Sequence, residues 1–433
     1  MVKIATFAKP ETVSGKLTAE TDRMEIKLKL KRKMKVKFAL TTFLTTTLFY
    51  LNVTGQSINT ATPKASIDSF IVSKMAETGI VGIGASIIID KKLVWINGYG
   101  YSDKETKVPF TPSTIMNIAS ISKTFTGVCI MKAVEEGLVS LDEDINTYLP
   151  FKVINPNFPN EKITLRHLAT HTSGLTDRNP FYGDSTYYYG GRKPEPLGEF
   201  LKNYFVQGGK HYSKDNFLNA KPATNRDYSN IGAGLAGFII ELRTGKTLNK
   251  YAKKYIFKPL KMQNSGWALN EIDITNHSKL YEKKGDSIVQ IQLYEMTTYP
   301  DGGVITSVDE LSKFFISLLN DGKYKKTRIL KTETVKEMLR FQHTETNKPE
   351  NVNIKKLNQG IFWATKLGAT RIGHNGSDHG VRTFMLSDLN KEFAVIVFFN
   401  TKLDEKDEGK YFDIYEELYK YAKDLKAKQT TSR

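Results

Sequence analysis

The sequence predicts an α/β (α+β) fold in which an antiparallel sheet is built from both chain termini, is flanked by helices, and has a mostly helical lobe inserted in the middle. Two observations lead to this prediction. Strand-like runs separated by turn residues occur at residues 82–101 and again at 370–401. Helical patches and long loops fill most of the chain between them. With 433 residues, 40% of them hydrophobic, the chain is long enough for two lobes around a sizeable core.

The first elements have clear boundaries in the sequence. A helical pattern covers residues 65–79 and ends at a glycine. Within the first strand-like run, the Asp-Lys-Lys segment at residues 90–92 marks a hairpin turn. A second helical pattern runs from about residue 120 to 136 and is also followed by a glycine.

The later elements differ in character. The loop at residues 177–196 is rich in tyrosine and glycine, and we expect an ordered surface flap there. Its residues Tyr187–Tyr189 either line the rim of a site or simply pack the flap. Small residues fill a predicted helix at 229–245, which can therefore pack closely against its neighbours. An amphipathic helix at 409–425 closes the chain.

The N-terminal segment is predicted to be a leader. A strongly basic stretch is followed by a 15-residue apolar run and by small residues, which is the pattern of a signal peptide cleaved after Gly55. The protein is therefore expected to be periplasmic or secreted, with no stable transmembrane segment after cleavage, or membrane-anchored if the leader stays. The predicted parts are a leader (1–55, signal peptide 34–55), a linker (56–63) and one unit (64–430) with an α/β lobe (64–115 plus 295–430) and a helical lobe (116–294).

The net charge of +17 does not indicate a nucleic-acid-binding protein. The first 55 residues hold 11 Lys and Arg against 4 Asp and Glu, so much of the excess belongs to the leader. The remaining lysines are scattered among acids, and neither zinc-finger spacing nor an aromatic RNA-binding signature occurs. We expect no nucleic-acid partner.

Ser120 and Lys123 form a Ser-x-x-Lys pair at the start of a predicted helix. Two ordinary polar residues in a first helical turn would look the same. A nucleophile there would benefit from the helix dipole and from free backbone N–H groups that can face an oxyanion. Lys123, one turn later, lies on the same side and can reach the serine oxygen. A serine hydroxyl needs such a neighbouring base to become a good nucleophile.

Two further elements accompany this pair. Tyr228-Ser229-Asn230 lies in a loop before a helix, and His374-Asn375-Gly376 lies on a predicted strand. Tyr228 is a second candidate base, and Asn230 can orient Lys123 or hold a substrate amide. The strand edge at Asn375 and Gly376 can pair with an extended substrate, and the Ser377 N–H can join that of Ser120 in an oxyanion hole. A competing Lys-x-Gly occurs at 366–368 but lacks the surrounding pattern.

In these three elements and their order, the chain resembles the serine β-lactamase and penicillin-binding protein superfamily, specifically its class C-like branch. The segments "ITLRHLATHTSGL" and "YPDGGVITSVDELSKF" are also similar to that branch, and the resemblance spans roughly residues 62–425. It implies a β-lactamase/transpeptidase-like fold and an acyl-serine mechanism without a metal or cofactor. Ser120 would attack, Lys123 and Tyr228 would move protons, and which of the two is the acylation base stays open.

The third element departs from the pattern of class C β-lactamases, because His374 stands where they have lysine. We expect its charge to change between roughly pH 5.5 and 7.5. Within the branch, His-x-Gly is typical of peptidases and some esterases. The leading prediction is therefore a serine hydrolase acting on a D-amino-acid peptide, as a peptidase or carboxypeptidase, or on an ester. A β-lactamase and a penicillin-binding sensor or non-turnover homologue are the alternatives.

Three polar residues outside these motifs are also candidates for a role in the site. His167 and His171 lack a third metal ligand at suitable spacing, so structural hydrogen bonding is favoured for both. Arg382 either holds a substrate carboxylate or makes a salt bridge. The expected partner is a small-molecule or peptide substrate, such as a cell-wall peptide or a β-lactam.

Overall fold

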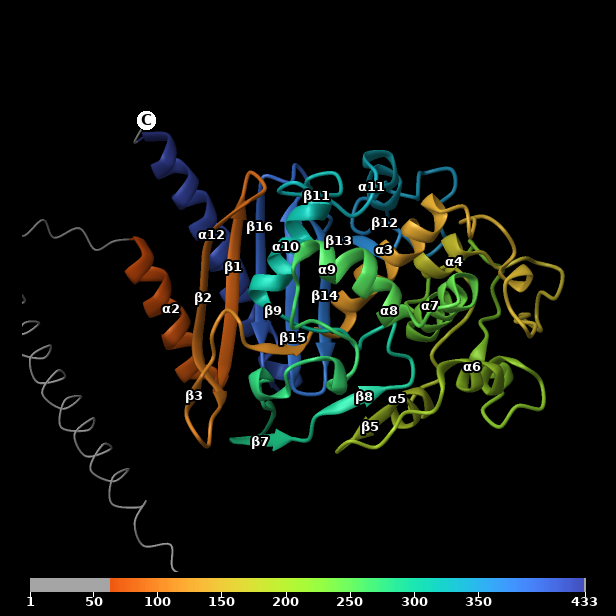
Figure 1. The fold of residues 1–433 in the computed structure, drawn as a ribbon, viewed down its shortest axis with the longest axis horizontal. Helices are drawn as coiled ribbons and strands as arrows, with labels where there is room; N and C mark the ends of the chain where they lie inside the picture. Colours follow the sequence, from red (N-terminus) through yellow and green to blue (C-terminus); the bar gives the residue numbers. More distant parts are fainter. Residues whose placement is uncertain (1–62, 432–433) are drawn as a thin grey trace, which may run out of the picture. The chain divides into compact units, whose positions relative to one another are not determined.

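An eight-stranded antiparallel sheet forms the centre of the fold, which a computed structural model describes for residues 63–431 (Figure 1). Its strands, in spatial order, are β12 (Gln359–Gly360), β13 (Trp363–Lys366), β14 (Arg371–Asp378), β15 (Val381–Asp388), β16 (Phe393–Phe399), β1 (Gly82–Ile89), β2 (Lys92–Asp103) and β3 (Val108–Pro109). The pairing of β1 with β16 joins the two ends of the chain in the middle of the sheet. The predicted fold class is confirmed.

Local sequence explains the central hairpin. Every residue of β1 is buried, as its run of apolar and small residues requires for a strand covered on both faces. Asp90 and Lys91 both adopt positive φ values, of 49° and 65°, which is the geometry of a tight two-residue hairpin turn. The predicted turn is therefore confirmed. Gly79 (φ 80°) ends the preceding helix, also as predicted.

One face of the sheet is covered by the first and last helices, α2 (Pro63–Thr78) and α12 (Gly409–Thr431), which lie side by side in Figure 1. Ile71 of α2 and Ile414 and Leu418 of α12 are fully buried against this face. The opposite face packs against α10 (Val308–Leu319) and the helical part of the molecule. Burial of both faces is what the near-continuous apolar strands demand.

The other helices belong mainly to the middle of the chain. They are α3 (Ser122–Glu135), α4 (Leu165–Ala169), α5 (Phe181–Thr186), α6 (Leu197–Phe205), α7 (Asn230–Thr244), α8 (Leu248–Ala252), α9 (Lys258–Leu260) and α11 (Thr332–Leu339). The smaller strand groups are β4 (Ile115–Asn117) with β9 (Ile305–Ser307), β5 (Tyr187–Tyr189) with β8 (Tyr294–Met296), β10 (Lys323–Tyr324) with β11 (Thr327–Arg328), and β6 (Leu280–Lys284) with β7 (Ser287–Ile291) and β17 (Thr401–Lys402).

The region from 177 to 291 has more regular structure than the sequence indicated. The expected flap contains α5 and β5, because Tyr182 is buried at 4% exposure and anchors the segment to the interior. The β6–β7 hairpin turns at Gly285, whose positive φ of 63° is the one local signal for it. Both elements are short and are stabilised by contacts with the rest of the fold. Their own sequences show no clear helical or strand periodicity.

The leader (1–55) and residues 56–62 of the linker lie outside the described residues, and the boundaries of the two lobes stay predictions. Between residues 63 and 431, no helix combines the length and the apolar character that crossing a membrane would require.

Candidate active site

Ser120 lies in a short 3-10 helix, Ala119–Ile121, immediately before α3. The β4–β9 pair holds the preceding segment, and the Ile118 N–H donates to the Val304 carbonyl at 2.9 Å. Ala119 has a φ of 50°, a left-handed value that residues with a side chain rarely adopt. Such strained residues cluster at functional sites, where the surrounding structure enforces them. Ser120 remains partly exposed although its neighbours are buried.

Lys123 is fully buried and directs its ammonium group at three acceptors. Its Nζ donates to the Ser120 Oγ at 3.2 Å, to the Asn230 Oδ1 at 2.6 Å and to the Asp301 carbonyl at 2.9 Å. A lysine ammonium has three donors and no acceptor. All three protons are therefore committed, and Ser120, Lys123 and Asn230 are brought together as the sequence predicted.

Negative charge around Lys123 keeps it protonated. Burial alone would lower the pKa of Lys123, but the nearby Tyr228 and the carboxylates of Asp301 and Asp177 outweigh it and raise that pKa. The Asp301 carboxylate lies 4.0 Å from the ammonium. Burial also raises the pKa of Asp301 itself to about 6, although the Tyr182 hydroxyl donates to it at 2.8 Å. Both carboxylates thus stabilise the ammonium form.

Asn230 is the first residue of α7, and Asp177 holds that helix end in place. The Asp177 carboxylate accepts the backbone N–H of Asn230 at 2.9 Å and that of Ile231 at 2.8 Å. The Ser229 side chain caps the same helix by accepting the Gly232 N–H at 3.0 Å. These caps fix the Asn230 side chain against Lys123.

Tyr228 lies between Lys123 and His171. The Lys123 Nζ is 4.9 Å from the centre of the tyrosine ring, and the His171 ring is 4.3 Å from it. The His171 Nδ1 accepts the Ser229 N–H at 3.2 Å, so the predicted hydrogen-bonding role of this histidine is confirmed. Burial drives the pKa of His171 well below its usual value, which keeps the ring neutral and able to accept.

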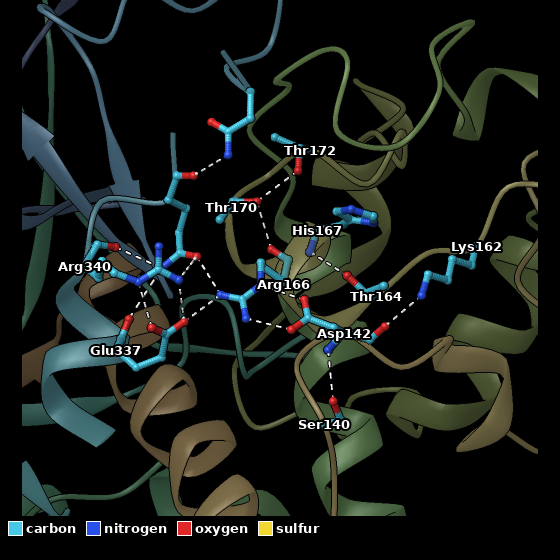
Figure 2. A network of polar contacts seen from close by, with 12 residues as sticks. Ser140, Asp142, Lys162, Thr164, Arg166, His167, Thr170, Thr172, Glu337 and Arg340 are labelled. Atoms are coloured by element: carbon cyan, nitrogen blue, oxygen red, sulfur yellow. Dashed lines mark hydrogen bonds and ion pairs between the residues drawn. The ribbon is translucent and has the colours of Figure 1, made fainter. Parts of the chain in front are cut away.

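Figure 2 shows a polar network around Arg166 that includes Thr170 and Thr172, the two neighbours of His171 in the sequence. Arg166 donates to Asp142 at 2.7 Å and to Glu337 at 2.8 Å, tying α4 to α11. The Thr170 hydroxyl donates to the Arg166 carbonyl at 2.8 Å and pairs with that of Thr172 at 2.9 Å. His171 lies between these threonines and therefore has little freedom to move.

Strand β14 carries the third predicted element and lies against the residue pair that precedes Ser120. A Cβ atom at Gly376 would be 2.5 Å from the Ile118 carbonyl oxygen and would also collide with the Thr383 hydroxyl. That hydroxyl donates to the same carbonyl at 2.9 Å. Glycine at 376 thus allows the strand to approach the nucleophile closely.

On the edge of β14 that faces away from β15, only the first residues have a partner strand. β13 pairs with Arg371, Ile372 and Gly373 and with nothing beyond them. The predicted substrate-pairing edge at Asn375 and Gly376 is therefore not paired with β13.

His374 is nearly fully buried, at 3% exposure. Burial lowers its pKa well below the usual value, and the charges of Lys366 and Lys123 lower it further. The expected change of charge, centred on the ordinary histidine pKa of about 6.5, is therefore wrong, since the pKa of the buried ring lies well below that value. Its Nδ1 is 2.7 Å from the Asn375 carbonyl oxygen, which can only accept, so the proton is on Nδ1 and Nε2 is left as an acceptor.

Lys366 does not fill the position of the third element. It lies on β13, opposite Arg371, rather than on β14. Its charge nevertheless lowers the pKa of His374. Burial lowers the pKa of Lys366 itself to about 8. The competing Lys-x-Gly of the sequence thus contributes a cation beside the motif and not the motif itself.

Strand alternation places Asn375, Ser377 and Arg382 on the other face of the sheet. Asn375 pairs with Phe384 and Ser377 with Arg382, so all four point toward α12. The Arg382 guanidinium packs 5.1 Å from the Phe384 ring and 5.7 Å from that of Phe412. The structure does not bring Arg382 to the nucleophile, and its substrate-binding role stays a prediction, as does the oxyanion hole of the Ser120 and Ser377 N–H groups.

Two residues of the site were not predicted. Asp301 is contained in a segment that resembled the family, but its carbonyl contact with Lys123 crosses 178 positions of the chain. Asp177 follows a glycine turn in the tyrosine-rich loop and has no motif of its own. Neither contact has a local sequence signal.

Comparison with known proteins shows the family of the chain. A family model described as "Beta-lactamase" matches residues 67–418, which is most of the chain. The chain belongs to the beta-lactamase family.

Similar members of the family have diverse names. Protein flp of Staphylococcus aureus (strain MRSA252) is 26% identical over 337 residues, which are 77% of this chain and 62% of that protein. The chain therefore spans about three fifths of the length of this curated relative. The octameric penicillin-binding protein homologue from Pyrococcus abyssi is 26% identical, with a TM-score of 0.60, and the match covers 77% of this chain and 73% of the other.

A third similarity concerns the beta-lactamase fold alone. The D-amino acid amidase from Ochrobactrum anthropi SV3, solved with L-phenylalanine amide, is 20% identical with a TM-score of 0.65. The match covers 85% of this chain and 99% of the amidase.

Proposed function

We propose that the protein is an exported serine hydrolase that acts on amide, peptide or ester bonds through an acyl-serine intermediate. One observation carries the proposal: the Lys123 ammonium joins the Ser120 hydroxyl to Asn230 and Asp301 in one buried hydrogen-bond set. Family membership supports it, because the beta-lactamase fold is generally that of a serine hydrolase.

The chemistry follows from the positions of the donors. The Ser120 Oγ attacks the substrate carbonyl carbon and forms an ester as the bond to the leaving group breaks. Because the Lys123 protons are all committed, Tyr228 is the better candidate to take the serine proton and pass it to the leaving group. Water then attacks the ester: its hydroxyl joins the acyl carbon, one of its protons passes to the Ser120 Oγ as the ester bond breaks, and the acid is released. The Ser120 and Ser377 N–H groups would stabilise the oxyanion in both steps.

The substrate is proposed to be a D-amino-acid peptide or amide, or an ester. The similarity to the D-amino acid amidase favours this class over β-lactams. Neutral His374 also disfavours a β-lactamase, since the imidazole provides no permanent cation for the β-lactam carboxylate. A penicillin-binding sensor is the second candidate, and the intact set of Ser120, Lys123, Tyr228 and Asn230 favours turnover instead.

A covalent label tests the proposal. Fluorophosphonate should add one adduct to the protein, and intact-mass spectrometry should find none on Ser120→Ala. That variant should keep the fold, because loss of a partly exposed polar residue at a helix start costs about 1 kcal/mol. A matching change elsewhere, Ser113→Ala, should leave labelling unchanged. An adduct on Ser120→Ala would refute the assignment, and a stable adduct from a fluorescent penicillin would favour the sensor.

Export is a separate proposal that rests on the leader alone. The mature chain should begin near Gln56 and accumulate outside the cytoplasm. N-terminal sequencing of protein from the extracytoplasmic fraction tests this. A cytoplasmic product that retains residues 34–55 would contradict it.

A further inference from the structure

Strand β14 presents three side-chain positions to the nucleophile, and the last of them is acidic. These are alternate positions of the strand and therefore share one of its faces: His374, Gly376 and Asp378. Because Gly376 touches the residues before Ser120, His374 and Asp378 lie on opposite sides of the nucleophile along the strand. Each is about 7 Å from Gly376 along the chain direction.

The Asp378 carboxylate also lies beside the loop that binds Lys123. A Cβ atom on Gly302 would be 3.8 Å from the Asp378 Oδ2. Gly302 directly follows Asp301, whose carbonyl accepts the Lys123 ammonium. Asp378 therefore belongs to the immediate surroundings of the reaction centre, although no step of the proposed mechanism uses it.

Aromatic rings from the tyrosine-rich loop surround this carboxylate. β5 brings Tyr187 and Tyr189, and its partner β8 brings Tyr294. The rings of Tyr187 and Tyr189 lie 5.4 and 5.7 Å from that of Tyr294. The next residue along the chain from Asp378, His379, packs its ring 4.8 Å from Tyr187. Tyr187 and Tyr189 therefore pack in one aromatic cluster with Tyr294 and His379.

The cluster lacks the cation that its carboxylate would need. Among the described residues, Asp378 makes no ion pair with a lysine or arginine. The His379 N–H donates to it at 2.8 Å, and the phenols of Tyr187 and Tyr294 also donate to it. His379 directs its own Nδ1 at Glu282, 3.3 Å away, and is exposed. Burial raises the pKa of Asp378, and His379 and then the two phenols only partly oppose this.

Tyr294 also faces this carboxylate. It is 1% exposed, and its hydroxyl makes no short, well-aligned hydrogen bond among the described residues. Burial raises the pKa of this phenol, and the neighbouring Asp378 carboxylate, toward which the hydroxyl is directed, raises it further.

We propose that Asp378, walled by Tyr187, Tyr189 and Tyr294, is an ammonium-binding subsite that selects acyl substrates carrying a free amino group. A carboxylate provides the charge-assisted hydrogen bond, and aromatic faces provide the surface that alkylammonium groups bind. This inference rests on the proposed function and specifies its substrate class: aminoacyl amides and esters rather than N-acylated ones.

The test compares matched substrates on matched variants. We would measure kcat/KM for D-alanine p-nitroanilide, N-acetyl-D-alanine p-nitroanilide and the neutral ester p-nitrophenyl butyrate. Asp378→Asn should lower the value for the free amine at least tenfold and leave the other two within about twofold. Glu282→Gln, which removes a neighbouring charge outside the cluster, should leave all three within about twofold. Tyr294→Phe should lower only the free-amine value, by about threefold.

Each outcome decides a different point. Equal losses on all three substrates in Asp378→Asn, or no loss on any, would overturn the subsite. If that variant does not fold, the wild-type protein still decides, because a preference for the N-acetyl substrate over the free amine contradicts the inference. Absence of fluorophosphonate labelling in the wild type would instead remove the proposed function itself.

Discussion

The two ends of the nucleophile-facing edge of β14 differ in charge. At one end, neutral His374 lies within reach of the charges of Lys366 and Lys123. At the other end, Asp378 lies among phenols without a paired lysine or arginine among the described residues. Gly376 separates the two ends and contacts the segment before Ser120.

In the proposed site, one strand orients a substrate by charge as well as by backbone pairing. Hydrogen bonds along an exposed strand edge are nearly the same in either substrate direction. Opposite charges at the two ends remove that ambiguity, since complementary charge selects one orientation and penalises the other. The two ends can therefore be tested separately from each other and from the nucleophile.

The largest effect should come from the middle of the strand. Gly376→Ala places a Cβ against the Ile118 carbonyl oxygen, and a backbone atom cannot move aside as a flexible side chain can. A displacement of about 1 Å near reacting groups can cost roughly 100-fold in rate, and we expect that loss in kcat/KM for every substrate. Gly409→Ala is the control, because a Cβ there meets nothing within 4 Å. Equal activity of both variants would show that β14 does not face the nucleophile.

An intermediate effect, on the pKa of His374, should appear at the end of β14 that lies near Lys366. Lys366→Met removes a charge that lowers the pKa of His374, so the pKa of His374 should rise. An imidazole NMR titration, assigned with His374→Gln, should show a wild-type His374 midpoint well below 6.5 and a higher midpoint in Lys366→Met. An unchanged midpoint would show that the two groups do not interact.

The same depressed pKa predicts how stability depends on pH. The unfolded chain protonates His374 near pH 6.5, whereas the folded protein does not. The free energy of unfolding should therefore fall as the pH drops below about 6.5, and His171 should act in the same direction. Urea denaturation at pH 7.5 and 5.5 should show a smaller drop for His374→Gln than for the wild type. A larger drop would reverse the assigned direction.

The smallest effect on activity should come from the face of the sheet that α12 covers. Arg382 is opposite Ser377, near the acidic end, but its guanidinium packs against Phe384 and Phe412 under α12. Arg382→Met keeps much of that packing, so kcat/KM should stay within about twofold for both the free-amine and the N-acetyl substrate. A selective loss on an anionic substrate would instead support the substrate-carboxylate role that the sequence left open.

The sequence predicted the fold and the Ser120–Lys123 pair from local patterns, whereas Asn230, 107 positions from Lys123, was grouped with them by the order of the motifs and the family resemblance. A helix start fixes the spacing of the first two, and a capped helix fixes the third. The contact between Asp301 and Lys123 could not be predicted, since it uses a backbone carbonyl that every residue has. The charge of His374 was mispredicted because burial and a lysine on the next strand set it, and neither is visible in the motif.

The face of Arg382, by contrast, could have been predicted. Its strand alternates regularly, and Phe384, two residues on, is a core residue that α12 covers. Period-two alternation alone then places Arg382 on that same face. The tyrosine cluster had no such signal, since β5 and β8 are each three residues long.

The pairing of β1 with β16 has a consequence for how the chain can acquire its structure. Ile83 pairs with Phe399 and Ile89 with Phe393, so the central ladder of the sheet joins residues more than 300 positions apart. No partial chain emerging from a ribosome can complete that ladder, and loop closure over such a distance is entropically slow. Folding of the sheet must therefore wait for almost the whole polypeptide, and until then the apolar β1 has no partner strand on one side. A chain with this topology therefore exposes one apolar strand edge until its synthesis is nearly complete, which is the condition under which unpaired strands aggregate.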